Sequence, residues 1–284
     1  MMPARFKNIL VPVDFTVNTD LALKKAITFC QDEGTTLHLF HVQRVVLPGV
    51  WHSMQYFVAG YTRRQVNEDR LRLMAALEQI RQKIGQQYPG ITVYTSVAFG
   101  EPVEEAILKK STRLKSDLIV IGKKSRRRFL PFLQQVIPNR LAAKSGLPVL
   151  TVHANTENQE IKTVVIPISS KSPDNKLLLL EALRKTKLQV RLVTFKKDDK
   201  DGTMARHSLF QAIRRLKKNP TIPVDYTELP GTNKAKSLLR YCTKVGADVL
   251  IAHPDSETCV HTWTNTHISD ILPKTSAMAV LTVR

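Results

Sequence analysis

The apolar residues of this chain fall into short continuous runs that alternate with segments of helical spacing. The runs are rich in β-branched residues, as is typical of strands buried on both faces, and four of them lie at 7–13, 37–42, 162–168 and 190–195. Between the runs, apolar residues recur every three or four positions: Leu71, Met74, Leu77 and Ile80, and later Leu209, Ile213 and Leu216. Strands that alternate with helices predict right-handed βαβ units and a parallel sheet.

The second half of the chain repeats the first. Residues 100–153 align without a gap on residues 231–284, and twelve of these 54 pairs are identical. We therefore predict two α/β domains, 1–154 and 160–284, related by a pseudo-two-fold axis. Each is expected to be a Rossmann-like (flavodoxin-like) domain, with a five-stranded parallel sheet flanked by helices.

Both repeats contain the sequence Val-Leu-Thr-Val, at 149–152 and at 280–283. These segments are candidate edge strands, and an unpaired apolar edge promotes aggregation. Pairing the two edges with each other removes that hazard. We therefore predict a seam between them, which would make the chain a compact pseudo-dimeric monomer.

One segment has no counterpart in the second repeat. Residues 45–64 are nearly uncharged and carry four aromatic residues: Trp51, Tyr56, Phe57 and Tyr61. The composition is consistent with a lid or a partner surface. It is equally consistent with a loop folded onto its own domain.

In its order of motifs the chain resembles the universal stress protein family, in the tandem two-domain form. The motifs are Asn-Ile-Leu-Val-Pro-Val-Asp at 8–14, Phe-His-Val at 40–42, Gly-Glu-Pro at 100–102, Asp-Leu-Ile-Val-Ile-Gly at 117–122 and Pro-Val-Leu-Thr-Val at 148–152. The resemblance implies a ligand site at the carboxyl ends of the strands. It also implies the same seam, which single-domain members form between subunits.

Nucleotide-binding members of the family carry Gly-x2-Gly-x9-Gly-Ser/Thr after the fourth strand. Glycines allow the backbone to approach phosphates, and amides at a helix N-terminus complement their charge. Here only Gly122 matches, because Ser125, Gln135 and Val136 occupy the other positions. The second repeat has His253, Ser256, Thr266 and His267 there, and Ser169 where the first has an acidic residue. The resemblance therefore limits nucleotide candidates to the first domain: Asp14, Val42, Gly122 and Ser125.

A basic loop follows Gly122. It offers five cations as anion-binding candidates: Lys123, Lys124, Arg126, Arg127 and Arg128. Such side chains bind phosphate-bearing or acidic groups, but a solvated basic loop has the same composition. The loop has no interleaved aromatic residues, so we expect no dedicated nucleic-acid site. The formal charge of +19 favours anionic partners in general.

The corresponding loop of the second repeat contains candidate metal ligands: His253, Cys259, His261 and His267. Imidazole and thiolate are zinc ligands, but the spacing matches no short zinc signature. Ordinary surface histidines would have the same composition. Cys30 lies in the first helical segment and is expected to be a small core residue.

The sequence contains no paired carboxylates, nucleophile elbow or P-loop lysine motif that would indicate an enzyme. It also contains no long apolar run or signal segment, so we expect a cytoplasmic protein without a membrane span. No cofactor is required, although ATP or AMP could bind the first domain. Three functions remain open: a non-catalytic stress-response or signalling protein that binds an unknown protein or small anionic ligand, an ATP/AMP binder or slow ATPase, and a metal- or anion-responsive sensor.

Overall fold

The computed structural model describes the chain in segments. These are residues 6–30, 34–43, 63–123, 138–153, 156, 160–170, 173–183, 188–196, 200–218, 222–230, 233–253, 259–260, 266–267 and 278–284. The first half contains β1 (Asn8–Val13), α1 (Val17–Phe29), β2 (Thr36–Gln43), α2 (Arg63–Gln87), β3 (Thr92–Phe99), α3 (Val103–Arg113), β4 (Leu118–Gly122), α4 (Pro138–Ser145) and β5 (Val149–Val152).

The second half repeats this order with one addition. It contains β6 (Thr163–Pro167), α5 (Asp174–Leu183), β7 (Gln189–Phe195), α6 (Lys200–Lys217), β8 (Val224–Leu229), α7 (Lys234–Lys244), β9 (Val249–Ala252) and β12 (Ala279–Thr282). Between β9 and β12 lies a short antiparallel hairpin of β10 (Cys259–Val260) and β11 (Thr266–His267). The helix expected before the last strand falls outside the described residues.

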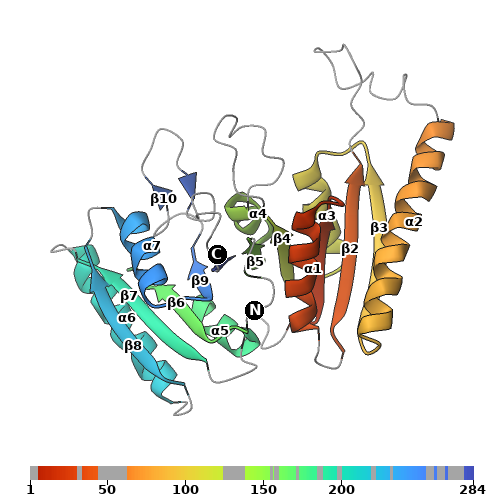
Figure 1. Ribbon diagram of the computed structural model, residues 1–284. Helices are drawn as coiled ribbons and strands as arrows, with labels where there is room; N and C mark the ends of the chain where they lie inside the picture. Colours follow the sequence, from red (N-terminus) through yellow and green to blue (C-terminus); the bar gives the residue numbers. More distant parts are fainter. Residues whose placement is uncertain are drawn as a thin grey trace, which may run out of the picture.

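The strands form one ten-stranded sheet in the order β3-β2-β1-β4-β5-β12-β9-β6-β7-β8. Within each half all neighbours are parallel, and the order 3-2-1-4-5 is that of a Rossmann-type sheet. The second half mirrors this order, so that β3 and β8 are the two edges of the sheet, at opposite ends of the molecule (Figure 1). The predicted fold class is confirmed. The domain limits at 154 and 160 stay predictions.

The two halves join through β5 and β12, which pair antiparallel. Val280 lies opposite Thr151, Leu281 opposite Leu150, and Thr282 opposite Val149. This pairing confirms the predicted seam. Thr151 and Thr282 are fully buried on the same face of it, and neither hydroxyl has a hydrogen-bond partner within the described part of the chain.

Arg284, two residues beyond β12, reinforces this junction. The Arg284 guanidinium donates to the Ala143 carbonyl near the end of α4, at 3.0 Å, and the Asn175 amide in α5 donates to the Arg284 carbonyl, also at 3.0 Å. Arg284 therefore connects a helix of each half across the seam.

The two faces of the sheet are packed differently. On one face, buried residues of α1, α2, α5 and α6 form a single cluster that continues across the seam through Leu150 and Leu281. On the other face, α3 and α4 cover one cluster around Leu10, and α7 covers a separate cluster around Val165. On that face, the hydrophobic core is therefore continuous between the two halves.

An aspartate holds the amino ends of the central strands in each half. The Asp117 carboxylate accepts hydrogen bonds from the backbone N–H groups of Lys7 (2.7 Å) and Asn8 (3.1 Å). Asp248 accepts equivalent bonds from Lys162 (2.9 Å) and Thr163 (2.7 Å). Burial raises the pKa of Asp117, although these bonds act in the opposite direction. The Asp117/Asp248 identity of the repeat therefore reflects the way the sheet is held together.

Two expectations from the sequence need correction. The spacing places Leu71 on the buried face of α2, but Leu71 is 72% exposed, because the buried stripe runs instead through Leu73, Leu77 and Ile84. The sequence places the insertion at 45–64, but α2 already begins at Arg63, and most of that segment lies outside the described residues. Cys30 is buried as expected, at the C-cap of α1.

Candidate functional site at the carboxyl edge of the first half

Asp14 directly follows β1 and builds the start of α1. Its Oδ1 accepts hydrogen bonds from the Thr16 N–H (3.0 Å), the Thr16 hydroxyl (2.7 Å) and the Thr19 hydroxyl (2.6 Å). Thr16 is in turn the N-cap of α1. Burial raises the pKa of Asp14, but the bonds from Thr19 and Thr16 outweigh burial and leave the pKa below its ordinary value. The carboxylate is therefore held as an anion within the helix cap.

Phe15 and His41 lie beside this cap, and the sequence does not single them out as site residues. The Phe15 ring is 39% exposed and lies 4.8 Å from the His41 ring, centroid to centroid. Phe15 has φ of 55°, a left-handed conformation that is strained for a bulky residue and concentrates at functional sites. The His41 ring bonds to the Val13 carbonyl through Nδ1 (2.8 Å) and contacts Gln43 Oε1 through Nε2 (3.3 Å).

Gly122, at the end of β4, has a structural reason to be glycine. A Cβ at this position would lie 1.7 Å from the backbone oxygen of Asn18, in the first turn of α1. Only glycine therefore allows β4 and the N-terminus of α1 to approach this closely. Val42, the third nucleotide candidate, is partly buried against the cluster around Leu10 and Phe40. The fourth, Ser125, lies outside the described residues.

The basic loop can be judged only at its first residue. Lys123 is 8% exposed, and its N–H donates to the Val152 carbonyl at 2.9 Å, so it continues the pairing of β4 with β5. Lys123 is therefore buried at the junction of β4 and β5, and its anion-binding role stays a prediction. Lys124, Arg126, Arg127 and Arg128 lie outside the described residues, and their anion-binding role stays a prediction.

The same edge of the second half has different chemistry. Ser169 stands where the first half has Asp14, and Lys176 is buried in the first turn of α5. The Lys176 ammonium donates to the Pro167 carbonyl at the end of β6, at 2.7 Å. The second half thus has a serine in place of the capping aspartate, and a buried lysine bound to the strand end. The two edges are therefore not equivalent sites.

The candidate metal ligands are brought together only in part. In the β10–β11 hairpin, Cys259 and His267 occupy directly facing positions. His253 follows β9 and is half-buried, and His261 lies outside the described residues. Among the residues that the structure describes, no group of three or more potential ligands gathers around one point. A metal site here stays a prediction.

Two Rossmann-type halves, with a capped aspartate at the carboxyl edge of only one, define a tandem α/β protein. Comparison with family models matches residues 5–153 to the universal stress protein family. The chain belongs to this family. No significant match is found among curated proteins.

Solved structures match over nearly the whole chain. A universal stress protein from Archaeoglobus fulgidus has a TM-score of 0.73 at 17% identity, covering 99% of this chain and 98% of its own. A putative universal stress protein from Pseudomonas aeruginosa has a TM-score of 0.52 at 12% identity, covering 99% and 94%. The cytoplasmic domain of a prokaryotic cation chloride cotransporter has 0.53 at 14%, covering 97% and 94%. At these identities the likeness shows the fold. In the described part of this chain, no helix is long and apolar enough to cross a membrane.

Proposed function

We propose that the chain is a non-catalytic binding protein of the universal stress type, which acts by holding a small ligand or a protein partner. The observation that carries the proposal is the use made of Asp14 and Gly122. Asp14 is engaged by three donors in the α1 cap, and Gly122 permits a backbone contact with Asn18. Two of the four nucleotide candidates thus already have structural roles.

The same edge offers little for acid–base catalysis. The His41 ring, the titratable group beside Phe15, is already bonded to the Val13 carbonyl and contacts Gln43, which orients it and occupies both nitrogens. A general base must reach the proton that it removes, with a nitrogen available to accept it. Phe15 and His41 instead present a partly exposed ring pair, which is suited to contact with a flat or apolar group.

ATP or AMP binding by the first half is the second candidate function, because Asp14, Val42 and Gly122 are retained there. We expect such binding to be weak. Val136 replaces the Ser/Thr hydroxyl of the motif, and a lost phosphate contact of that kind is worth about 1.5–3 kcal/mol, or roughly 10–100-fold in affinity. Slow ATP hydrolysis would require that binding.

A thermal-shift series with ATP, AMP, zinc and polyphosphate tests these functions. A ligand at about 100 times its Kd stabilises the folded state by about 2.7 kcal/mol, which corresponds to a rise in Tm of roughly 5–10 °C for a chain of this size. We expect no such rise with ATP and magnesium. Micromolar, magnesium-dependent ATP binding in calorimetry, or ATP retained through purification, would contradict the proposal.

Two variants assign any ligand that does bind. Phe15→Ala should abolish a shift that arises at the carboxyl edge of the first half, whereas Ser169→Ala, at the matching position of the second half, should leave it unchanged. A zinc-induced shift that Cys259→Ser removes would instead support the metal-responsive candidate, which the facing positions of Cys259 and His267 favour.

A further inference from the structure

The outer surface of α6 is basic and has no acidic residue of its own from Gly202 to Lys217. Four cations lie on this stretch: Arg206, Arg214, Arg215 and Lys217. Arg215 pairs with Asp174, and Arg206 reaches Glu228 at 3.9 Å. Arg214 and Lys217 form no ion pair with any residue in the described ranges. Both lie in the last turn of α6, where positive side chains interact favourably with the negative end of the helix dipole.

Two large aromatic side chains lie on the same surface. Phe210 of α6 is 66% exposed and Tyr226 of the edge strand β8 is 64% exposed. Exposure of this degree leaves most of each ring in water. β8 is the edge of the sheet, and no further strand of the described chain pairs with it. Met204, also in α6, is 48% exposed.

The topology places Phe210 and Tyr226 on the same side of the sheet, at matching heights along α6 and β8. The Arg206 guanidinium lies 3.9 Å from the Glu228 carboxylate, so this part of α6 lies near that end of β8. A crossover helix runs antiparallel to the strands that it connects. Moving four residues along α6 to Phe210 advances about 6 Å, and moving two residues back along β8 to Tyr226 covers about the same distance. Both steps keep the same side of the helix and the same face of the strand.

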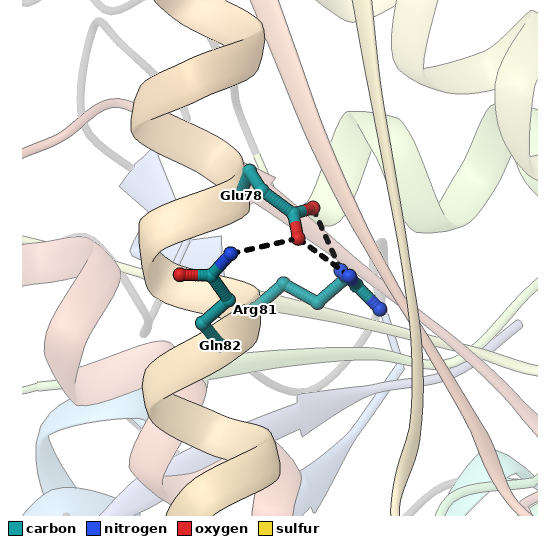
Figure 2. Close-up of polar contacts among 3 residues, drawn as sticks. All are labelled: Glu78, Arg81 and Gln82. Carbon is teal, nitrogen blue, oxygen red and sulfur yellow. Dashed lines mark hydrogen bonds and ion pairs between the residues drawn. The ribbon is translucent and has the colours of Figure 1, made fainter.

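The corresponding helix of the first half shows that this surface is not a general property of the fold. α2 flanks the opposite edge strand, β3 (Figure 1), and three of its arginines are paired within the helix. Arg64 pairs with Glu68 at 2.8 Å, and Arg72 pairs with Asp69 at 2.8 Å. Figure 2 shows Glu78 of α2 bound by Arg81 and Gln82. Three arginines of α2 are thus paired within their own helix. In α6, Arg214 and Lys217 form no ion pair with any residue in the described ranges.

We propose that Phe210, Tyr226, Arg206, Arg214 and Lys217 form a binding surface for single-stranded nucleic acid. Exposed aromatic rings provide stacking platforms for bases, and adjacent cations follow the phosphates, a combination that binds single strands with little sequence preference. The net charge of +19 adds long-range attraction. The expectation of no nucleic-acid site rested on the loop after Gly122, and the α6–β8 surface supplies the aromatic residues missing there.

The test is fluorescence anisotropy of a labelled single-stranded oligouridylate, titrated with the full chain at several salt concentrations. Phe210→Ala with Tyr226→Ala should weaken binding by roughly 10–100-fold. Arg214→Ser with Lys217→Ser should weaken it and reduce the slope of log K against log salt by about 1.4. Neither pair should change Tm, because the side chains are exposed.

Matched controls come from α2. Arg72→Ser with Arg81→Ser removes the same charge from paired arginines, and Leu71→Ala removes an equally exposed apolar side chain. Both controls should bind like the wild type within about threefold. Equal weakening of oligonucleotide binding by the α2 and α6 charge variants would show that only the net positive charge of the protein attracts the oligonucleotide. That result would overturn the proposal.

Other outcomes identify other occupants and would also overturn it. These are unchanged oligonucleotide binding by the Phe210/Tyr226 variant, no binding by the wild type at low salt, or wild-type binding to phosphatidylserine vesicles or polyglutamate in place of the oligonucleotide. Because the variants lie far along the sheet from Phe15, failure here leaves the ligand test of the first half unaffected.

Discussion

The two halves of this protein agree where the sheet is built and differ where a ligand could bind. Asp117 and Asp248 make the same pair of backbone hydrogen bonds, and the Val-Leu-Thr-Val strands pair with each other. At the carboxyl edge, in contrast, a capped aspartate in one half corresponds to a serine in the other.

The difference extends to the edges of the sheet. In the first half, the His38 and Tyr94 rings stack across β2 and β3 at 5.3 Å. In the second half, an ion pair between Arg191 and Asp225 at 2.9 Å joins the corresponding strands β7 and β8. Both pairs hold neighbouring strands together by different physical means. Identity between the repeats therefore marks the residues that hold the fold together, and divergence marks surfaces free to acquire separate roles.

The strongest test of this comparison removes the shared aspartates. Asp117→Ala and Asp248→Ala should each lower the free energy of unfolding by about 2–3 kcal/mol, because two backbone N–H groups lose a charged acceptor. We expect the larger loss for Asp248→Ala. Lys25 is 2% exposed, and although burial lowers its pKa, the charge of Asp248 stabilises its ammonium form.

Urea unfolding followed by circular dichroism measures both losses. Asp225→Ala is the control, since Asp225 is exposed and its partners are the side chains of Arg191 and Gln189 rather than backbone N–H groups. Its effect should stay within about 0.5–1 kcal/mol. A smaller loss for Asp248→Ala than for Asp117→Ala would show that the coupling to Lys25 across the seam is negligible.

A smaller effect of opposite sign is expected at the seam. Thr151→Val and Thr282→Val should each raise the free energy of unfolding by about 1 kcal/mol, because each replaces a buried hydroxyl without a partner in the described chain by a methyl group of the same shape. Val149→Thr and Val280→Thr, at facing positions with equal burial, should lower it. If the valine variants are less stable than the wild type, the threonine hydroxyls are satisfied by buried water.

The smallest expected effect is the pH dependence of the Asp14 cap. Since the pKa of Asp14 is lowered in the folded protein, its charge contributes stability above the ordinary value of 3.8. That contribution is lost as the pH falls through the lower pKa of the folded state. The Tm difference between wild type and Asp14→Asn should therefore shrink on acidification. A constant difference from neutral pH downward would mean that the carboxylate charge plays no part in the cap.

Much of the fold follows from the sequence, because strands buried on both faces require continuous β-branched runs. Those runs predict the strands and the seam between residues 149–152 and 280–283. The helical spacing misplaces Leu71 in α2. Leu71 is exposed although it fits the apolar spacing, because spacing alone does not show which leucines of a helix face the core. Phe15 and His41 escape prediction as a pair because they meet only after β1 and β2 are aligned.

The α6–β8 surface is also beyond the reach of the sequence. Phe210 fits the helical spacing of α6, and Tyr226 lies in a strand, so each is predicted as an ordinary structural residue. Their exposure depends on how far α6 extends over the last strand of the sheet, which local patterns do not encode. For the metal candidates Cys259 and His267, the sequence supplies the residue types but not their arrangement. The hairpin that places them in facing positions has no signal in the composition of the loop.

The antiparallel seam also sets an order for biosynthesis. About 130 residues separate β5 from β12, so at about 5–20 residues per second the growing chain carries an open, apolar β5 edge for roughly 6–25 s before its partner strand is made. During that interval the sheet of the first half has an unpaired edge strand, which other chains translated from the same mRNA can contact. Chaperone engagement of ribosome-bound chains should therefore peak after β5 emerges and fall once β12 emerges, and selective profiling of those chains would show whether it does.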